Sequence, residues 1–472
     1  MNLINSYARL PEHFYANTQT ASVPKPALIA WNEDLASHLG LNDLDTDKDS
    51  LALIFSGSEP LPGGKTIAMA YAGHQFGHFV PQLGDGRAAL LGEVVSPVDG
   101  GRYDIQLKGS GQTPFSRRGD GKSSLGPVIR EYLLSEAMHR LGVPTTRALA
   151  AVSTGEMVIR ESDEPGGVLA RVAASHIRVG TFQFFTARND QDALAELTHY
   201  ATARHYPDAT TKERPVLAFF SEVVEVQAKL IAHWMALGFI HGVMNTDNTA
   251  ISGETLDYGP CAFMDEFHID KVFSSIDQHG RYAYGQQANM AQWNLARLAE
   301  CLMMLEGEQE DYESALERFQ PRFEAHYFAL MCEKLGLTSH NKSHAELVTG
   351  WLQHLQDHQL DYSLSFRQLT ERLNKNDSPV FGKFEIRWLQ CIDEQPGGRQ
   401  SAAQLMASTN PVVIPRNHQV ERAIQAAFQG DFSVFNELRQ VLAEPFTEQP
   451  GLAYYSEPPL AHERVAMTFC GT

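Results

Sequence analysis

Apolar and polar residues alternate along the first part of the chain in the manner of β-strands. The segment FVPQLGDGRAALLGEVVS holds a Gly-Asp-Gly turn between two apolar runs, and VDGG then leads into the alternating segment RYDIQLKG. Period-two alternation predicts strands with one buried face, and glycine-rich turns between apolar runs predict hairpins. We therefore expect a hairpin with its turn at residues 84–86, followed by a third strand that ends at Lys108.

The pattern becomes helical after this strand. A polar, glycine-rich loop at 109–126 precedes Pro127 and VIREYLLSEAMHRLG, and a proline in the first turn with a glycine at the end is typical of a helix. Apolar stretches within 147–173 predict further strands. From about residue 190, apolar residues recur every three to four positions and predict helices at 192–204, 215–237, 288–305, 312–335, 343–356, 366–374 and 398–407.

A β-rich first part that leads into a helical second part predicts an α+β fold with two lobes and a cleft between them. The predicted N-lobe covers residues 1–180, with the nucleotide-gripping hairpin, the lysine strand and the glutamate helix. The predicted C-lobe covers residues 181–472, with a metal-binding catalytic loop and a C-terminal helical extension. Because no Pro/Ser-rich linker separates them, we expect the two lobes to be closely joined.

Composition narrows the possible partners and the compartment. The 472 residues carry a formal net charge of -19, so no overall field attracts nucleic acid or anionic lipid. The five cysteines are scattered without a CxxC pair, which is typical of a reducing compartment. No apolar stretch approaches the ~18 residues of a membrane span. We expect a soluble, cytoplasmic, monomeric protein that binds neither nucleic acid nor membrane.

Lys108 and Glu131 form the first candidate constellation. Glu131, Leu134, Met138 and Leu141 share one apolar helix face, and a carboxylate on that face needs a cation beside it. In kinases, a strand lysine paired with a helix glutamate positions the nucleotide phosphates. An ordinary structural ion pair explains these two residues equally well.

The segment HGVMNTDNTAISGETLDYGP, residues 241–260, is more informative. Kinases place a loop of the form H-[G/R]-D-x-x-x-x-N after an apolar helix and then a D-[F/Y]-G triplet, whose Asp holds the metal together with the loop Asn. Here Asn248 and Asp257 keep that frame, which favours a site for a metal-bound nucleotide over a polar turn. The position of the usual catalytic aspartate is Val243, which cannot accept a proton.

Asp247 is the nearby carboxylate that can replace the missing base. It lies directly before Asn248, so a proton acceptor and a metal ligand would be adjacent. A turn-capping aspartate is an almost equally good explanation of Asp247 taken alone.

Basic residues concentrate near the same predicted cleft. Arg171 and Arg178 lie seven apart, and the glycine-rich loop contributes Arg117, Arg118 and Lys122. In an acidic chain this concentration favours a triphosphate as the ligand, because one guanidinium group can bind two phosphate oxygens at once. We expect Gly84, Gly86 and Arg87 of the predicted hairpin turn to approach the nucleotide as well, although a Gly-Asp-Gly hairpin usually has no role beyond the turn itself.

At these residues the chain resembles the selenoprotein O family, known as SelO and as YdiU in bacteria. The resemblance covers nearly the whole chain and rests on long ungapped segments: YAGHQFGHFVPQLGDGRA, DIQLKGSGQTPFSRRGDGKSSLGPVIREYLLSEAMHRLGVPTTRALA, GFIHGVMNTDN, LDYGPCAFMDEF and NPVVIPRNHQVERAI. It implies a bilobal, protein-kinase-like fold in which ATP is inverted relative to ordinary kinases. It also implies transfer of AMP to Ser, Thr or Tyr hydroxyls of target proteins.

The resemblance also implies roles for individual residues. Asp247 would be the catalytic proton acceptor, Asn248 and Asp257 would hold Mg²⁺, and Lys108 and Glu131 would form the ion pair. Mn²⁺ and UTP stay open as alternatives to Mg²⁺ and ATP. The remaining residues implied to line the ATP site are Gly84, Gly86, Arg87, Asp120, Gly121, Arg171 and Arg178.

One departure from the family and two other functions stay open. Many relatives carry a selenocysteine or a cysteine pair near the C-terminus, whereas this chain has the single Cys470 there. Two alternatives to protein adenylylation stay open. The chain is an atypical phosphotransferase, or it is a pseudokinase scaffold that binds nucleotide without catalysing a reaction. Val243 and the surplus of arginines argue against phosphotransfer.

Overall fold

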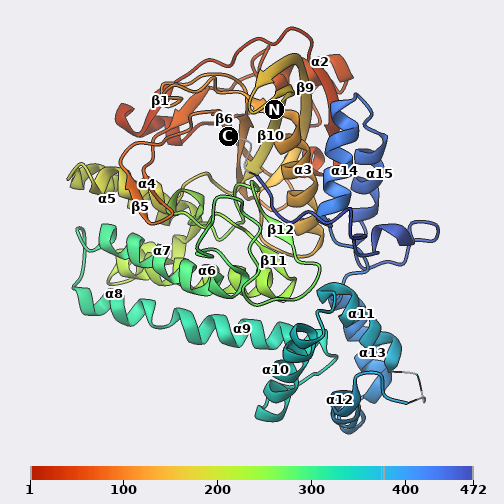
Figure 1. Cartoon of the computed structure of the whole chain (residues 1–472). Helices are drawn as coiled ribbons and strands as arrows, with labels where there is room; N and C mark the ends of the chain where they lie inside the picture. The colour runs from red at the N-terminus through yellow and green to blue at the C-terminus, as the bar shows by residue number, and fades with distance from the viewer. Residues whose placement is uncertain (1–2, 374, 376–377, 470–472) are drawn as a thin grey trace.

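The computed structural model of the chain describes residues 3–373, 375 and 378–469. Its first part is built on an antiparallel sheet with the strand order β1-β3-β6-β7-β10-β9-β2, and β8 pairs with β10. Figure 1 shows this sheet at one end of the molecule and most of the helices at the other. The strands of the sheet are β1 (Tyr15–Asn17), β2 (Ala27–Trp31), β3 (Ile67–Met69), β6 (Ala88–Val95), β7 (Arg102–Lys108), β8 (Ser123–Ser124), β9 (Arg147–Ile159) and β10 (Asp163–Ala173).

Alternation along β7 sorts its side chains between the two faces of the sheet. Ile105 and Leu107 belong to a core that also contains residues of α1 (Glu33–His38) and α2 (Lys48–Ser56). Gln106 and Lys108 therefore point to the opposite face, and the register places Arg171 of β10 directly across from Gln106. Two cations of the predicted nucleotide site thus share one face of the sheet, which also packs against α3 (Leu125–Arg140).

The second part of the chain is helical, apart from the short antiparallel ladder of β11 (Phe239–Ile240) and β12 (Ala262–Phe263). The apolar helix α6 (Pro215–Ala236) lies in its core, and the loop that follows α6 and β11 carries Asp247, Asn248 and Asp257. The other helices of this part are α4 (Val179–Thr186), α5 (Gln191–His205), α7 (Gln287–Leu302), α8 (Gln309–Leu316), α9 (Phe319–Lys334), α10 (Lys342–Asp357), α11 (Tyr362–Arg372), α12 (Gly382–Glu394) and α13 (Gly398–Thr409).

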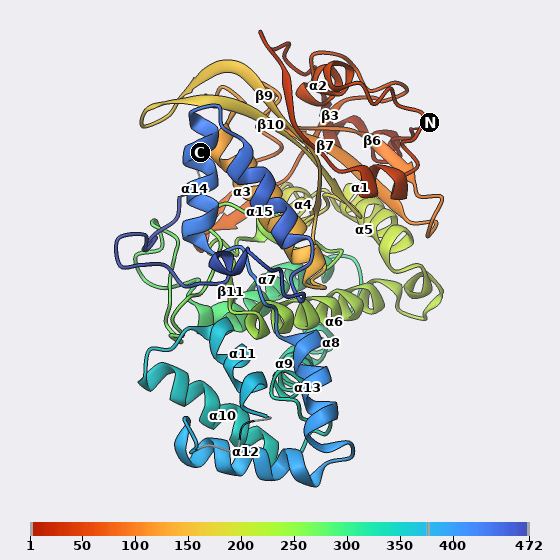
Figure 2. The same ribbon diagram turned by 90° about the vertical axis from the view of Figure 1, so that its right-hand side faces the viewer.

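The last two helices return to the sheet. Figure 2 shows α14 (Asn417–Phe428) and α15 (Ser433–Leu442) lying along α3, and the rings of Tyr132 and Phe435 meet edge to face at 5.5 Å. Just before α14, Arg416 is buried and lies 2.7 Å from Asp361 of the helical part. The C-terminal helices therefore brace the helix that carries Glu131 and connect it to the rest of the chain.

The predicted α+β division is confirmed, but the hairpin with its turn at residues 84–86 was wrong. The strand β5 (His78–Val80) pairs with β4 (Gly73–Gln75) in a separate ladder, and the partners of β6 are β3 and β7. Residues 84–86 form a turn whose central Asp85 is buried and accepts hydrogen bonds from the Met69 amide and the Gln106 side chain. These long-range contacts, rather than local pairing, hold the turn. The predicted strand that ends at Lys108 is present as β7, and residues 96–101 join it to β6 in a hairpin.

The predicted helices are present with one exception. The stretch 312–335 is two helices, α8 and α9, because Pro321 belongs in the first turn of a new helix and would break a continuous one. The pattern missed α1, α2, α4, α12, α14 and α15. In the described part of the chain, no helix combines the length and the apolar character needed to cross a bilayer. The predicted lobe boundary at residues 180 and 181 stays a prediction.

Candidate active site

Lys108 and Glu131 meet between the sheet and α3. Lys108 Nζ, at the end of β7, lies 2.6 Å from Glu131 Oε2 and 2.8 Å from Asp257 Oδ1. Glu131 is buried on the core-facing side of α3. Glu136 of the same helix lies outside this site and forms an ion pair of 2.8 Å with Arg147. The ion pair between strand lysine and helix glutamate is therefore present, and it includes the aspartate of the Asp-Tyr-Gly triplet.

Two buried arginines converge on the same aspartate. Arg171 NH1 lies 2.6 Å from Asp257 Oδ1 and 3.3 Å from Glu131 Oε1. Arg178, just before α4, places its NH1 3.4 Å from Asp257 Oδ2 and 2.8 Å from the Asp247 carbonyl oxygen, and its guanidinium lies over the ring of Tyr71. Among the described residues, three cations thus share two carboxylates in direct ion pairs.

The charge state of Asp257 follows from these neighbours. Burial alone would raise its pKa, but Arg171, Lys108 and Arg178 together hold the pKa well below its ordinary value. Its backbone has φ of +65°, a left-handed conformation that is costly for a residue with a Cβ and recurs at functional sites. Asp257 is therefore a permanently charged carboxylate in a strained position.

The loop that carries the other candidates begins at His241. The His241 ring stacks on Trp234 of α6 at 5.1 Å, and its Nε2 lies 2.9 Å from the Leu256 carbonyl oxygen, which ties the start of the loop to the residue before Asp257. Val243 is buried, and its carbonyl oxygen accepts a hydrogen bond from Asn248 Nδ2 at 3.0 Å. That bond orients the Asn248 amide so that Oδ1 is the atom left for another ligand.

Asp247 has very different surroundings. It is buried, its Oδ2 accepts a hydrogen bond from Gln75 Nε2 at 3.1 Å, and its Oδ1 has no hydrogen-bond partner among the described residues. Burial raises the pKa of this carboxyl to about 6, although Gln75 and Arg178 act in the opposite direction. A buried carboxylate with one free oxygen and a raised pKa is suited to accept a proton.

Glycines bring two loops together beside β6. Gly84 has φ of +71°, and a Cβ on it would lie 2.3 Å from the Phe115 ring. A Cβ on Gly121 would lie 2.1 Å from the Gly111 carbonyl oxygen, and the Gly86 carbonyl accepts a hydrogen bond from a side chain of the same loop. The glycine-rich loop thus folds onto residues 84–86, and Arg87 follows directly at the start of β6.

Other residues of the glycine-rich loop form ion pairs elsewhere in the chain. Asp120 is exposed and pairs with Arg160 at 3.0 Å, and Lys122 pairs with Glu156 at 2.6 Å. Neither contact reaches the Asp257 group. The structure therefore brings Lys108, Glu131, Arg171, Arg178 and Asp257 into one group and holds Asp120 at the outer side of the glycine-rich loop.

The family follows from comparison with known proteins. A family model described as "Protein adenylyltransferase SelO" matches residues 1–443. The chain belongs to the SelO family. A relative from Agrobacterium fabrum named "Protein nucleotidyltransferase YdiU" is 52% identical over 487 residues, which cover 100% of both chains. Relatives of the same name from Rhizobium leguminosarum and Rhodopseudomonas palustris are each 51% identical and cover 99% of this chain and 97% and 98% of their own lengths.

Membership of this family confirms three of the predictions made from sequence. The architecture is the kinase-like fold of the SelO family, the chain is an enzyme, and its class is nucleotidyltransferase. Phosphotransfer and a purely scaffolding role are therefore set aside. The roles of single residues stay predictions, and Cys470 lies outside the described residues.

A divalent metal fits the residues at this SelO-family site. The described residues contain no group of three or more His, Cys, Asp or Glu side chains that could hold an ion by themselves. Mg²⁺ does not need such a group, because it is usually bound by one or two protein oxygens and completed by water and substrate phosphates. Asn248 Oδ1 and the carboxylate of Asp257 supply oxygens of this kind, and the orphaned Asp247 Oδ1 lies on the residue next to Asn248.

Sequence reasoning missed the residues that cover Asp247. Gln75 of β4 donates to Asp247, and a Cβ on the neighbouring Gly73 would lie 2.7 Å from Asp247 Oδ1. Both belong to a hairpin more than 160 residues earlier in the chain, so no spacing near Asp247 could reveal them. The glycines of GHQFG were the available signal, because Gly73 begins β4 and Gly77 lies in the turn that leads to β5.

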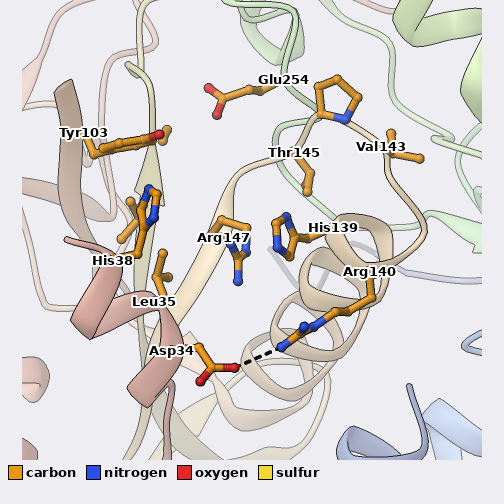
Figure 3. Close-up of a pocket in the computed structure, with 13 residues that line it drawn as sticks. Asp34, Leu35, His38, Tyr103, His139, Arg140, Val143, Thr145, Arg147 and Glu254 are labelled. Carbon is orange, nitrogen blue, oxygen red and sulfur yellow. Dashed lines mark hydrogen bonds and ion pairs between the residues drawn. The ribbon is translucent and has the colours of Figure 1, made fainter. Parts of the chain in front are cut away.

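A separate pocket lies on the other side of α3. Figure 3 shows residues of α1, α3 and the following loop around a cavity of about 430 Å³, with the Asp34–Arg140 ion pair of 3.1 Å across it. The described residues that line it include none of those predicted to bind nucleotide. One lining residue, Thr145, hydrogen-bonds Tyr258 of the Asp-Tyr-Gly triplet, so the pocket touches the back of the site.

Proposed function

We propose that this SelO-family chain transfers AMP from Mg²⁺-bound ATP to Ser, Thr or Tyr hydroxyls of other proteins, with Asp247 as the proton acceptor. The observation that carries the proposal is the separation of two carboxylates. Asp257 is surrounded by three cations, whereas Asp247 has one free oxygen and a pKa raised to about 6. The first arrangement suits a polyphosphate, and the second suits proton removal from a hydroxyl.

The reaction balances with the groups at hand. Asp247 Oδ1 takes the proton of the acceptor hydroxyl while the hydroxyl oxygen attacks the α-phosphorus of ATP. The bond between the α-phosphorus and the bridging oxygen of the β-phosphate breaks, pyrophosphate leaves, and the acceptor keeps AMP as a phosphodiester. Lys108, Arg171 and Arg178 bind the phosphates and stabilise the charge that grows on pyrophosphate. Because ATP brings its own negative charge, these cations can exchange their carboxylate partners for phosphate oxygens.

Asn248 and Asp257 would hold the divalent cation. When bound, such an ion neutralises phosphate charge and orients the α-phosphate for attack. Glu131 would keep Lys108 in place while Asp257 serves as a metal ligand. Gly84, Gly86, Arg87, Asp120 and Gly121 would line the remainder of the ATP site.

The test follows the phosphate that is transferred. The full-length chain is incubated with Mg²⁺, a mixture of cell proteins, and ATP labelled on either the α- or the γ-phosphate, with Asp257→Asn as the negative control. We expect α-label on protein and no γ-label. Transfer of γ-label would identify a phosphotransferase and contradict the proposal, as would nucleotide binding without any label.

Two further reactions define the cofactor and the donor. Replacing Mg²⁺ by Mn²⁺ tests the metal, and α-labelled UTP tests the nucleotide. We expect ATP with Mg²⁺ to support transfer. If only UTP labels protein, the adenylyl part of the proposal is wrong although nucleotidyl transfer stands.

A further inference from the structure

The β4–β5 hairpin is fastened to the loop that carries Asp247. The backbone N–H of His74 donates to Thr246 Oγ1 at 2.7 Å, and that of Phe76 donates to Asn245 Oδ1 at 3.1 Å. Figure 1 places β5 beside α4 and near α7. The outer side of the hairpin is therefore a protein surface next to the proposed proton acceptor, where an acceptor protein must approach.

That surface gathers arginine and aromatic side chains. The guanidinium of Arg281 lies 4.8 Å from the centre of the Trp293 ring, and that of Arg297 lies 4.9 Å from the same ring. The His74 ring meets Trp293 at 5.2 Å and Phe79 at 5.0 Å, and 39% of Phe79 is exposed. We name the following residues the arginine–tryptophan face: His74, Phe79, Arg281, Trp293 and Arg297.

The two arginines of this face differ in their partners. Arg297 pairs with Glu300 at 2.7 Å. Arg281 forms no ion pair within the described chain, and its Nε is buried without a hydrogen-bond partner. The nearby Asp277 forms no direct ion pair with Arg281 within the described residues, and its two oxygens accept the backbone N–H groups of Arg281 and Tyr282 at 2.9 and 2.7 Å.

The Arg281 guanidinium has no ion-pair partner within the described residues and lies against two aromatic rings. Its contacts with Trp293 and Tyr282 restrict the side chain, so less side-chain freedom is lost when a partner binds. The partner that matches a guanidinium fork is a carboxylate, which accepts two parallel hydrogen bonds. Tryptophan and arginine are also the residue types that contribute most to protein–protein binding.

We infer that the arginine–tryptophan face is the docking surface for the acceptor protein and that Arg281 binds an Asp or Glu side chain close to the hydroxyl that is modified. This inference rests on the proposed function. The hairpin links the two events, because Gln75 contacts Asp247 while its neighbour His74 contacts Trp293. Binding of an acidic side chain at Arg281 would thus orient the acceptor hydroxyl toward Asp247.

The test uses peptides in place of the unidentified acceptor protein. One set of synthetic peptides carries a central Ser, Thr or Tyr with Glu at a single flanking position, and the matched set carries Gln at that position. Transfer of α-label from ATP is measured for wild type, Arg281→Gln, Arg281→Glu and the control Arg322→Gln. The control removes a 61% exposed arginine side chain of α9, where it pairs with Glu225.

For wild type we expect a preference of about tenfold in kcat/KM for Glu over Gln at one flanking position, carried by KM. Arg281→Gln should lose this preference while its KM for ATP is unchanged, and Arg281→Glu should favour a peptide with Arg at that position. Arg322→Gln should behave as wild type. Thermal unfolding of each variant verifies that it is folded.

Two results would overturn the inference in distinguishable ways. If wild type labels the peptides and Arg281→Gln keeps the same Glu preference, or if wild type shows no such preference, the docking surface is wrong and the proposed function stands. If wild type transfers no α-label to peptides or to a mixture of cell proteins, the proposed function fails and the inference fails with it.

Discussion

Asp247 and Asp257 lie ten residues apart in one loop, yet the protein surrounds them in opposite ways. Asp257 is paired with Lys108, Arg171 and Arg178, which hold its pKa well below the ordinary value. Asp247 accepts one hydrogen bond from Gln75, keeps a buried oxygen that no described residue contacts by a hydrogen bond, and has a pKa raised to about 6 by burial.

The difference separates two tasks that carboxylates perform at active sites. A carboxylate held among cations stays charged at every physiological pH, so it can hold charge but cannot exchange a proton. A carboxylate with a raised pKa and an oxygen that has no hydrogen-bond partner can take a proton and release it again. Cations on one side and an isolated base on the other thus divide the site into a phosphate side and an acceptor side.

The largest effect is expected on the phosphate side. Asp257→Asn removes the proposed metal ligand, so α-label transfer should fall by roughly 10³-fold or more. It also leaves Lys108 and Arg171 with Glu131 as their remaining ion-pair partner, and Arg178 without an ion pair among the described residues, so the free energy of unfolding should fall by about 3 kcal/mol. Radiolabel transfer and urea unfolding measure the two effects. A variant with normal transfer would remove Asp257 from the site.

On the acceptor side the two effects should separate. Asp247→Asn should lower transfer by roughly 10²- to 10⁴-fold, because the amide cannot accept the proton. The free energy of unfolding should not fall, because the substitution replaces a buried charge that has an unsatisfied oxygen. ATP binding, measured by calorimetry, should be retained. A loss of stability like that of Asp257→Asn would contradict the comparison.

A smaller loss should follow from crowding Asp247. A Cβ on Gly73 would lie 2.7 Å from Asp247 Oδ1 and 2.9 Å from its Cβ, so Gly73→Ala should displace the base and lower transfer by about tenfold, with ATP affinity unchanged. The matched control is Gly350→Ala in α10, where a Cβ would meet nothing within 4 Å. We expect the control to be fully active and more stable by about 1 kcal/mol. Equal activity of both variants would show that transfer does not depend on the position of the Asp247 carboxylate.

The smallest effect concerns a histidine behind the phosphate side. Burial lowers the pKa of His176 to about 4. Arg171 and Arg178 also lower this pKa, whereas the nearby Asp104 raises it. The unfolded chain binds this proton below an ordinary pKa of about 6.5, so stability should fall as pH drops from 6.5 toward 4. When the pH is lowered from 7 to 5.5, the free energy of unfolding measured in urea should fall by about 1 kcal/mol less for His176→Gln than for wild type. Parallel losses would show that His176 is not kept neutral in the fold.

Local pattern was enough for several elements and for part of the site. Helix spacing and end signals predicted α3, α5, α6 and α10 within a few residues, because a long amphipathic face and its end residues are local properties. The same spacing placed Glu131, and not Glu136, on the buried face of α3, and the structure has Glu131 next to Lys108.

Long-range contacts decided the rest. Residues 84–86 read as a hairpin turn, yet Asp85 is held by Met69 and Gln106, and β5 pairs with β4 instead. A turn signal states that the chain bends and does not state which strands pair afterwards, since pairing depends on burial elsewhere.

The residue types and their order along the chain were sufficient to indicate a nucleotide site with Lys108, Glu131, Asn248 and Asp257, because these side chains lie at fixed positions in local motifs. The chemical difference between Asp247 and Asp257 could not be read from one loop. It arises because three cations from β7, β10 and the start of α4 reach Asp257, while an uncharged hairpin more than 160 residues away covers Asp247. A pKa depends on what surrounds a group in space, and that is a property of the folded chain.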